Sequence, residues 1–153
     1  KTEPVAEPAA NPSPSAVDVD FLARVTRIID GDTIEVRNAE RGNIRIRFHG
    51  IDTPERNQPY GRAATRELKR ILIRAPVGVR VKDTDRYGRT VATIYQGDVN
   101  VNVEMVKRGY AWWYRRYARF DGDLRRAEAE AKGERRGLWE DDNPVPPWEW
   151  RRR

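Results

Sequence analysis

Short segments of alternating apolar and polar residues recur through the first two thirds of the chain, the pattern of strands that bury one face. The alternation is cleanest in Thr-Ile-Glu-Val-Arg and Ile-Arg-Ile-Arg-Phe. Turn residues separate the segments, with Asp30-Gly31 after the first and Tyr87-Gly88 before the last. We predict strands over residues 22–28, 33–37, 44–48, 77–82 and 90–95.

A different spacing predicts helices. Four apolar residues recur at i, i+4, i+7 and i+8, which forms one apolar stripe on a helix of about a dozen residues. These residues are Ala64, Leu68, Ile71 and Leu72. Asn102 is predicted to be the N-cap of a short helix that stops at Gly109. A last helix is predicted from about Gly122 to Arg136, ended by Gly137.

Five strands with evenly spaced turns and a few helices between them are typical of a small curled barrel. We therefore predict an α+β, mainly β fold: a five-stranded OB-fold barrel with about three helices. The folded domain should span residues 18–143. Residues 1–17 are rich in Pro and Ala and are predicted to be a disordered linker. Residues 144–153 form a Trp/Arg-rich tail that either packs back on the domain or extends as an electrostatic arm.

Composition narrows the chemistry. The chain has 30 basic and 24 acidic residues and a net charge of +6. A basic domain attracts polyanions, nucleic acid foremost, although a well-solvated surface would have the same composition. Cysteine is absent and there is one histidine. This excludes disulfides, thiol nucleophiles and Cys-based zinc sites, and it disfavours Ser-His triads. The groups that remain available for catalysis are the side chains of Asp, Glu, Arg and Tyr, together with a hard cation.

Two aspartates are candidate ligands for that cation. Asp32 should lie at the start of the second strand and Asp52 just past the end of the third. If those strands are neighbours, the two carboxylates, a backbone carbonyl and water could form a sparse Ca²⁺ site. Glu55, three residues further on, could accept a proton from water beside the metal. Taken singly, each aspartate also fits an ordinary turn or loop opening, and Glu55 fits a surface charge.

Arg47 and Arg89 are expected near strand ends. Paired guanidiniums can bind the equatorial oxygens of a phosphodiester and stabilise the charge that develops on them. In a chain with 25 arginines, both could equally be surface residues. Aromatic and basic residues are interleaved over residues 110–117, which fits single-strand binding, although Trp112 and Trp113 are each more expected in the core. His49 is expected to be structural.

Three short strings, in this order, carry a family resemblance: Asp-Gly-Asp-Thr at 30–33, Arg47 with Asp-Thr-Pro-Glu at 52–55, and Asp-Arg-Tyr-Gly-Arg at 85–89. From about residue 20 to 140 the chain resembles the thermonuclease family, the staphylococcal nuclease-like domains. The Pro-Pro-Trp-Glu-Trp-Arg ending is similar to that of bacterial members.

The resemblance implies roles for individual residues. Asp32, Asp52 and the main-chain carbonyl of Thr53 would bind calcium. Glu55 would be the general base or the carboxylate that orients water. Arg47 and Arg89 would bind the phosphate and stabilise the transition state. Substrate-binding residues would be Arg86, Tyr87 and Tyr117.

The resemblance also implies an activity: calcium-dependent hydrolysis of DNA and RNA that leaves 3′-phosphate ends. Single strands should be favoured, and the protein should be a monomer without a stable protein partner. One alternative is a non-catalytic nucleic-acid-binding OB-fold module, and another is a structural protein associated with lipid or cell wall. The presence of all five charged side chains favours the enzyme. The N-terminal linker suggests a secreted, periplasmic or cell-surface location in a bacterium, after removal of a signal or anchor segment.

Overall fold

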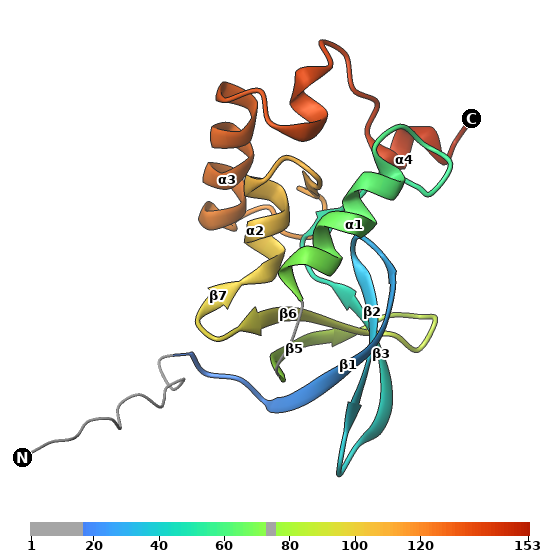
Figure 1. Ribbon diagram of the computed structural model, residues 1–153, viewed down its shortest axis with the longest axis vertical. Coiled ribbons are helices and arrows are strands. Elements are labelled where there is room, and N and C mark those ends of the chain that lie inside the picture. The colour runs from blue at the N-terminus through green and yellow to red at the C-terminus, as the bar shows by residue number, and fades with distance from the viewer. Residues whose placement is uncertain (1–16, 73–75) are drawn as a thin grey trace, which may run out of the picture.

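Five strands close into a barrel in the computed structural model, which describes residues 17–72 and 76–153. Neighbouring strands run antiparallel in the order β3-β2-β1-β5-β6, and a parallel pairing of β3 with β6 closes the ring (Figure 1). The predicted five-stranded barrel is confirmed, whereas the predicted linker lies almost wholly outside the described residues. The strands are β1 (Phe21–Asp30), β2 (Thr33–Asn38), β3 (Gly42–Phe48), β5 (Val77–Thr84) and β6 (Thr90–Gln96).

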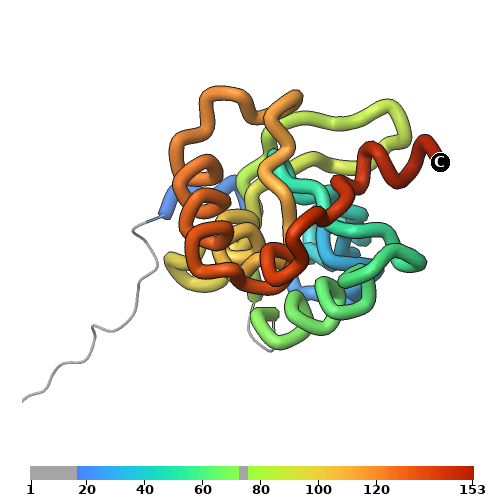
Figure 2. Tube along the Cα trace, turned by 90° about the horizontal axis from the view of Figure 1, so that it is seen from above, coloured from blue at the N-terminus to red at the C-terminus, as the bar shows by residue number. Residues whose placement is uncertain are grey.

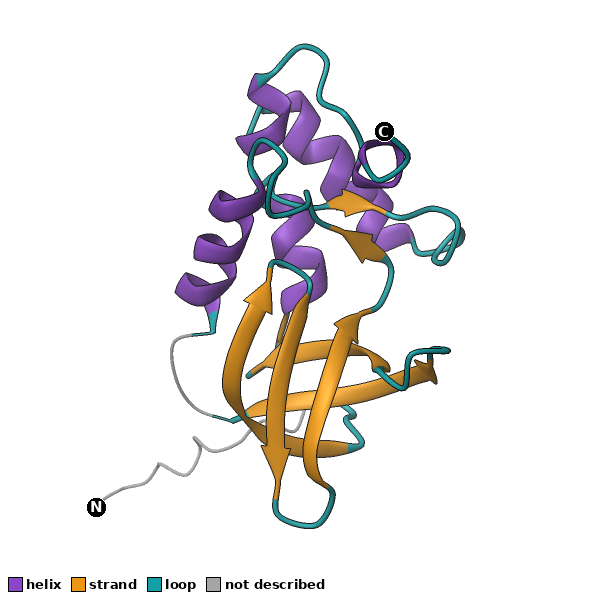
Figure 3. Cartoon of the chain, turned by 90° about the vertical axis from the view of Figure 1, so that its right-hand side faces the viewer, coloured by secondary structure: helices purple, strands orange, loops and turns teal. Residues whose placement is uncertain are grey.

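Helices gather over one end of the barrel (Figure 3). None of the described helices is long and apolar enough to cross a membrane. The sequence pattern did not indicate three further short strands. β7 (Val99–Asn100) pairs with β6 at the edge of the barrel sheet, and β4 (Ile51–Asp52) pairs with β8 (Trp112–Trp113) in a separate two-stranded sheet. The helices are α1 (Gly61–Ile71), α2 (Val101–Lys107), α3 (Gly122–Gly133), the 3₁₀ helix η3 (Gly137–Glu140) and α4 (Pro147–Trp150).

The alternating residues of the strands fill the barrel, as their pattern predicted. Ile34 and Val36 of β2 and Ile46 of β3 are fully buried in one cluster, and α1 adds Ala64 and Leu68 to it. A second, smaller cluster lies under the C-terminal part of the chain. It contains Trp112, Ala131, Leu138 and Trp139, with Trp148 packed against it.

The predicted N-cap of α2 is wrong by two residues. Asn100 is the cap, and its Oδ1 accepts the Val103 backbone N–H at 3.0 Å. Asn102 is instead buried inside the helix, where its Oδ1 accepts the Ile94 N–H and its Nδ2 donates to the His49 carbonyl. Both asparagines satisfy local capping rules, so only the position of β6 beside the helix decides between them.

The last long helix is shorter than predicted, because α3 ends at Gly133. The backbone of Arg135 and of Gly137 then turns to positive φ, and Gly137 begins η3. A Cβ at position 137 would lie 2.4 Å from the Gly109 carbonyl oxygen, so glycine allows the end of α2 to contact η3.

The C-terminal tail packs back on the domain. The Trp148 ring stacks on Tyr114 with centroids 5.0 Å apart, and it meets Trp112 edge-on at 5.6 Å. Figure 2 shows the red C-terminal segment crossing over the cyan part of the chain. Of the two predicted alternatives, the packed tail is therefore correct.

Candidate active site

Two buried aspartates lie side by side at the rim of the barrel. The Thr53 backbone N–H, next to Asp52, donates to Oδ2 of Asp32 at 3.0 Å. The Asp32 carbonyl in turn accepts the Phe48 N–H at 2.8 Å, which ties the turn after β1 to the end of β3. Gly31 permits this approach, because a Cβ there would lie about 3 Å from the Thr53 side chain. The structure thus brings Asp32 to the chain segment that carries Asp52, the proximity that the sequence predicted, through the N–H of Thr53.

One guanidinium bridges the two carboxylates. Arg47 Nη1 lies 3.4 Å from Asp32 Oδ2, and its Nη2 lies 3.4 Å from Asp52 Oδ1. The Arg47 side chain also donates to the Phe48 carbonyl at 2.8 Å, which fixes it at the end of β3. Arg47 therefore lies beside both carboxylates, where it would meet a phosphate oxygen bound to a cation at this rim.

Glu55 lies on the loop that leaves β4. Its backbone N–H donates to Gln58 Oε1 at 2.9 Å, and its carboxylate Oε2 accepts Arg151 Nη1 at 2.7 Å. Gly61 allows this loop to fold onto the start of α1, because a Cβ there would lie 1.9 Å from the Glu55 carbonyl oxygen. Glu55 is connected to Asp52 through Arg151, which both side chains bind.

Arg151 is a site residue that sequence reasoning missed. Its Nη2 lies 2.9 Å from Asp52 Oδ2, and its Nη1 lies 3.3 Å from Asp52 Oδ1. The Trp/Arg-rich ending indicates a docked tail as one of two alternatives. No local pattern, however, predicts a partner 99 residues away.

The Arg89 side chain makes an ion pair within its own turn. Its Nε pairs with Asp85 Oδ2 at 2.8 Å within the β5–β6 turn, and the ion pairs of residues 17–72 and 76–153 include none between Arg89 and either aspartate of the site. Arg89 directly precedes Thr90, which pairs with Ile46 of β3. The backbone of Arg89 therefore lies beside β3, the strand that carries Arg47. Its side chain pairs with Asp85 within the β5–β6 turn.

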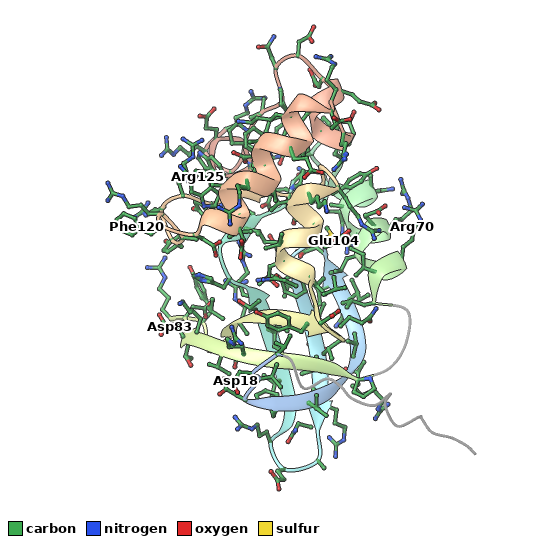
Figure 4. All side chains as sticks on the ribbon, turned by 90° about the vertical axis from the view of Figure 1, so that its left-hand side faces the viewer. Asp18, Arg70, Asp83, Glu104, Phe120 and Arg125 are labelled. Atoms are coloured by element: carbon green, nitrogen blue, oxygen red, sulfur yellow. The ribbon has the colours of Figure 1, made fainter. Side chains whose placement is uncertain are left out.

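The three predicted substrate-binding residues lie on exposed turns. Tyr87 and Tyr117 expose 70% and 60% of their surface, and Arg86 donates to the Tyr87 hydroxyl at 3.1 Å. Tyr117 meets Tyr114 edge-on, with centroids 4.9 Å apart. Figure 4 shows a further aromatic residue, Phe120, projecting from the loop before α3. These rings are available to bases, whereas Trp112 and Trp113 are buried as expected.

Burial and mutual repulsion perturb the carboxyl groups of the site. Burial, and then the charge of Asp32, raise the pKa of Asp30 from 3.8 to about 7. Burial raises the pKa of Asp52 to about 6 against the opposing hydrogen bond from Arg151. Burial also acts to raise the pKa of Asp32, but the Arg47 guanidinium and the hydrogen bonds to Asp32 hold it below its ordinary value. The site therefore concentrates negative charge that a bound cation would relieve.

A pH dependence of stability follows in the absence of divalent cations. The folded-state pKa values of Asp30 and Asp52 lie above 3.8, the ordinary value for an unfolded chain. The stability that these two groups contribute is therefore fully present below pH 3.8. It is lost as pH rises through about 6 for Asp52 and about 7 for Asp30. We expect the melting temperature in EDTA to fall over this range. Because Asp30→Asn removes one of the two groups, its melting temperature relative to wild type should rise with pH. If the melting temperatures of the two proteins changed with pH by the same amount, this assignment would be contradicted.

The donor set fits a hard cation. Carboxylate oxygens and a neighbouring backbone carbonyl are the ligands that Ca²⁺ prefers, and the site offers no sulfur or imidazole. Among residues 17–72 and 76–153, no group of three or more His, Cys, Asp or Glu side chains is arranged to hold a metal. A cation here would therefore depend on Asp32, Asp52, the Thr53 backbone and water.

The fold and the site define a barrel protein of the OB-fold class with an acidic rim bridged by arginine. A family model described as "Staphylococcal nuclease homologue" matches residues 45–141. An Escherichia coli protein named "Uncharacterized endonuclease" is 44% identical over 135 residues, covering 88% of this chain and 87% of the relative. A Shigella flexneri protein named "Micrococcal nuclease" is 42% identical over 143 residues, covering 87% and 82%. The chain belongs to the staphylococcal nuclease family.

Proposed function

We propose that this protein is a calcium-dependent nuclease that hydrolyses phosphodiester bonds of DNA and RNA and leaves 3′-phosphate ends. Family membership and the names of the relatives support a nuclease. The observation that carries the proposal furthest is the pair of buried aspartates bridged by Arg47, with Glu55 connected to the same cluster. This arrangement would supply metal ligands, a phosphate-binding cation and a base at one rim.

Each group has one role in the proposed reaction. Asp32, Asp52 and the Thr53 carbonyl would hold Ca²⁺, which when bound would polarise a phosphate oxygen. Glu55 accepts a proton from the attacking water as its oxygen bonds to phosphorus. The P–O5′ bond breaks, and the leaving oxygen takes up a proton from solvent. Arg47 donates to the non-bridging oxygens, where negative charge develops.

Arg89 would bind the phosphate through its Nη groups. Asp85 engages its Nε, so a phosphate could bind without loss of that ion pair. The position of Arg89 next to Thr90, beside β3, supports this role. Arg86, Tyr87 and Tyr117 would contact the flanking nucleotides, since exposed rings can stack on the bases of a single strand. Secretion and a monomeric state stay predictions.

Removing divalent cations tests the proposal. With single-stranded DNA or RNA as substrate, EDTA should reduce cleavage to the background rate. Added Ca²⁺ should restore cleavage, while Mg²⁺ should not, because it demands near-ideal octahedral geometry that this sparse donor set does not supply. Labelling the ends before and after phosphatase treatment should identify 3′-phosphates.

Three outcomes would contradict parts of the proposal. Full cleavage in EDTA would reject the metal, and equal rescue by Mg²⁺ would reject calcium as the specific cofactor. Binding of the oligonucleotide without any cleavage in Ca²⁺ would favour the alternative of a non-catalytic OB-fold module.

A further inference from the structure

The C-terminal segment holds Glu55 by its carboxylate. Arg151, just after α4, places Nη1 at 2.7 Å from Glu55 Oε2 and Nη2 at 2.9 Å from Asp52 Oδ2. One planar guanidinium thereby sets the spacing between the proposed base and a proposed metal ligand. In the described part of the chain, these contacts engage Oε2 of Glu55 and not Oε1. The second oxygen is therefore available to a water.

The same segment also holds the backbone of Glu55. Gln58 is buried, and its Oε1 accepts the Glu55 N–H at 2.9 Å. The Nε2 of the same amide donates to the Val145 carbonyl at 2.6 Å. Next to it, Trp150 Nε1 donates to Asn57 Oδ1 at 3.2 Å. Residues 145–151, named here the C-terminal clamp, thus contact the Glu55 loop at three places.

Aromatic packing anchors the clamp to the strand pair that carries Asp52. Trp148 stacks on Tyr114 and packs edge-on against Trp112. Trp112 lies opposite Asp52 in the antiparallel β4–β8 pair. The clamp is therefore attached to the same strand pair as the metal ligand, and through it the base is held relative to Asp52.

From these contacts we infer that the C-terminal clamp is a positioning element for the general base, with Arg151 as its positioning residue. The inference rests on the proposed role of Glu55. Arg151 and the rest of the clamp lie beyond the residues that the family model matches. Such positioning would favour catalysis, because a glutamate on a partly exposed loop can adopt many rotamers. If its side chain is already held in one rotamer before substrate binds, the reaction does not have to overcome that loss of conformational entropy.

Substitution of Arg151 tests the inference. We expect Arg151→Ala to lower kcat about 10- to 100-fold at saturating Ca²⁺, since small misplacements of a catalytic group cost rates of this order. The KM for a single-stranded oligonucleotide should change little. Arg151→Lys should retain part of the rate, and free guanidinium should partly restore Arg151→Ala. Arg153→Ala is the matched control, because this exposed arginine lies over the Trp150 ring and should leave kcat unchanged.

A double-mutant cycle separates positioning from direct action. If Arg151 acts through Glu55, adding Arg151→Ala to Glu55→Gln should cause no further loss of kcat. A readout that does not depend on activity is hydrogen exchange without Ca²⁺, which should become faster over residues 53–58 in Arg151→Ala. Thermal melts would show that the variant stays folded.

Several results would overturn the inference. An unchanged or higher kcat in Arg151→Ala would mean that the guanidinium does not support the base, and a higher rate would mean that it blocks the site. A raised KM with constant kcat would make Arg151 a substrate contact. If the losses of kcat caused by Arg151→Ala and Glu55→Gln were additive in the double mutant, Arg151 would not act through Glu55. If the wild-type protein cleaved no phosphodiester, the proposed function would fail instead, whereas the exchange experiment would still report on the clamp.

Discussion

Replacement of Glu55 by Gln should lower kcat about 10²- to 10⁴-fold, the contribution typical of a general base. Gln has nearly the same shape and can still accept the hydrogen bond that Arg151 donates to Oε2. The backbone bond from residue 55 to Gln58 is also unaffected. The loss should therefore be chemical, without a change in the melting temperature or in oligonucleotide binding. Steady-state cleavage of a single-stranded oligonucleotide in Ca²⁺ measures it.

Glu40→Gln is the matched control for this variant. Glu40 is exposed on the turn between β2 and β3, at the opposite end of this strand pair from Asp32 and Arg47, so its substitution should leave kcat at the wild-type value. Equal activity of wild type and Glu55→Gln would reject the assigned base. A loss seen only as a raised KM would assign Glu55 to substrate binding.

Replacement of Arg47 by Lys should be nearly as harmful. Lys keeps the positive charge but loses the planar fork that reaches Asp32 and Asp52 at the same time. We expect kcat/KM to fall about 10²- to 10³-fold, the usual cost of removing a preorganised donor from developing charge. The loss should persist at saturating substrate, because the interaction is strongest in the transition state.

Arg45 offers the control on the same strand. It pairs with Glu35 on the exposed face of the sheet, so Arg45→Lys should leave cleavage nearly unchanged. Comparable losses in Arg45→Lys and Arg47→Lys would show that general basic charge, and not the bridging position, is what the reaction requires.

The sequence by itself determined the barrel and most of the candidate site. Alternation records which face of a strand is buried, and the turns at Asp30-Gly31 and Tyr87-Gly88 mark where strands end, so both are local properties. The aspartates could be assigned to one rim because each lies at a strand end, where neighbouring strands meet.

Tertiary structure decided which polar groups pair. Asn100 and Asn102 are equally good caps in sequence, and the packing of the helix against β6 and His49 gives Asn102 a buried role. Arg89 looked like Arg47 in sequence, but its own turn supplies Asp85 as the nearer partner. Arg151 meets Asp52 because Trp148 anchors the tail. Such choices depend on which distant segments become neighbours, and spacing along a chain does not contain that information.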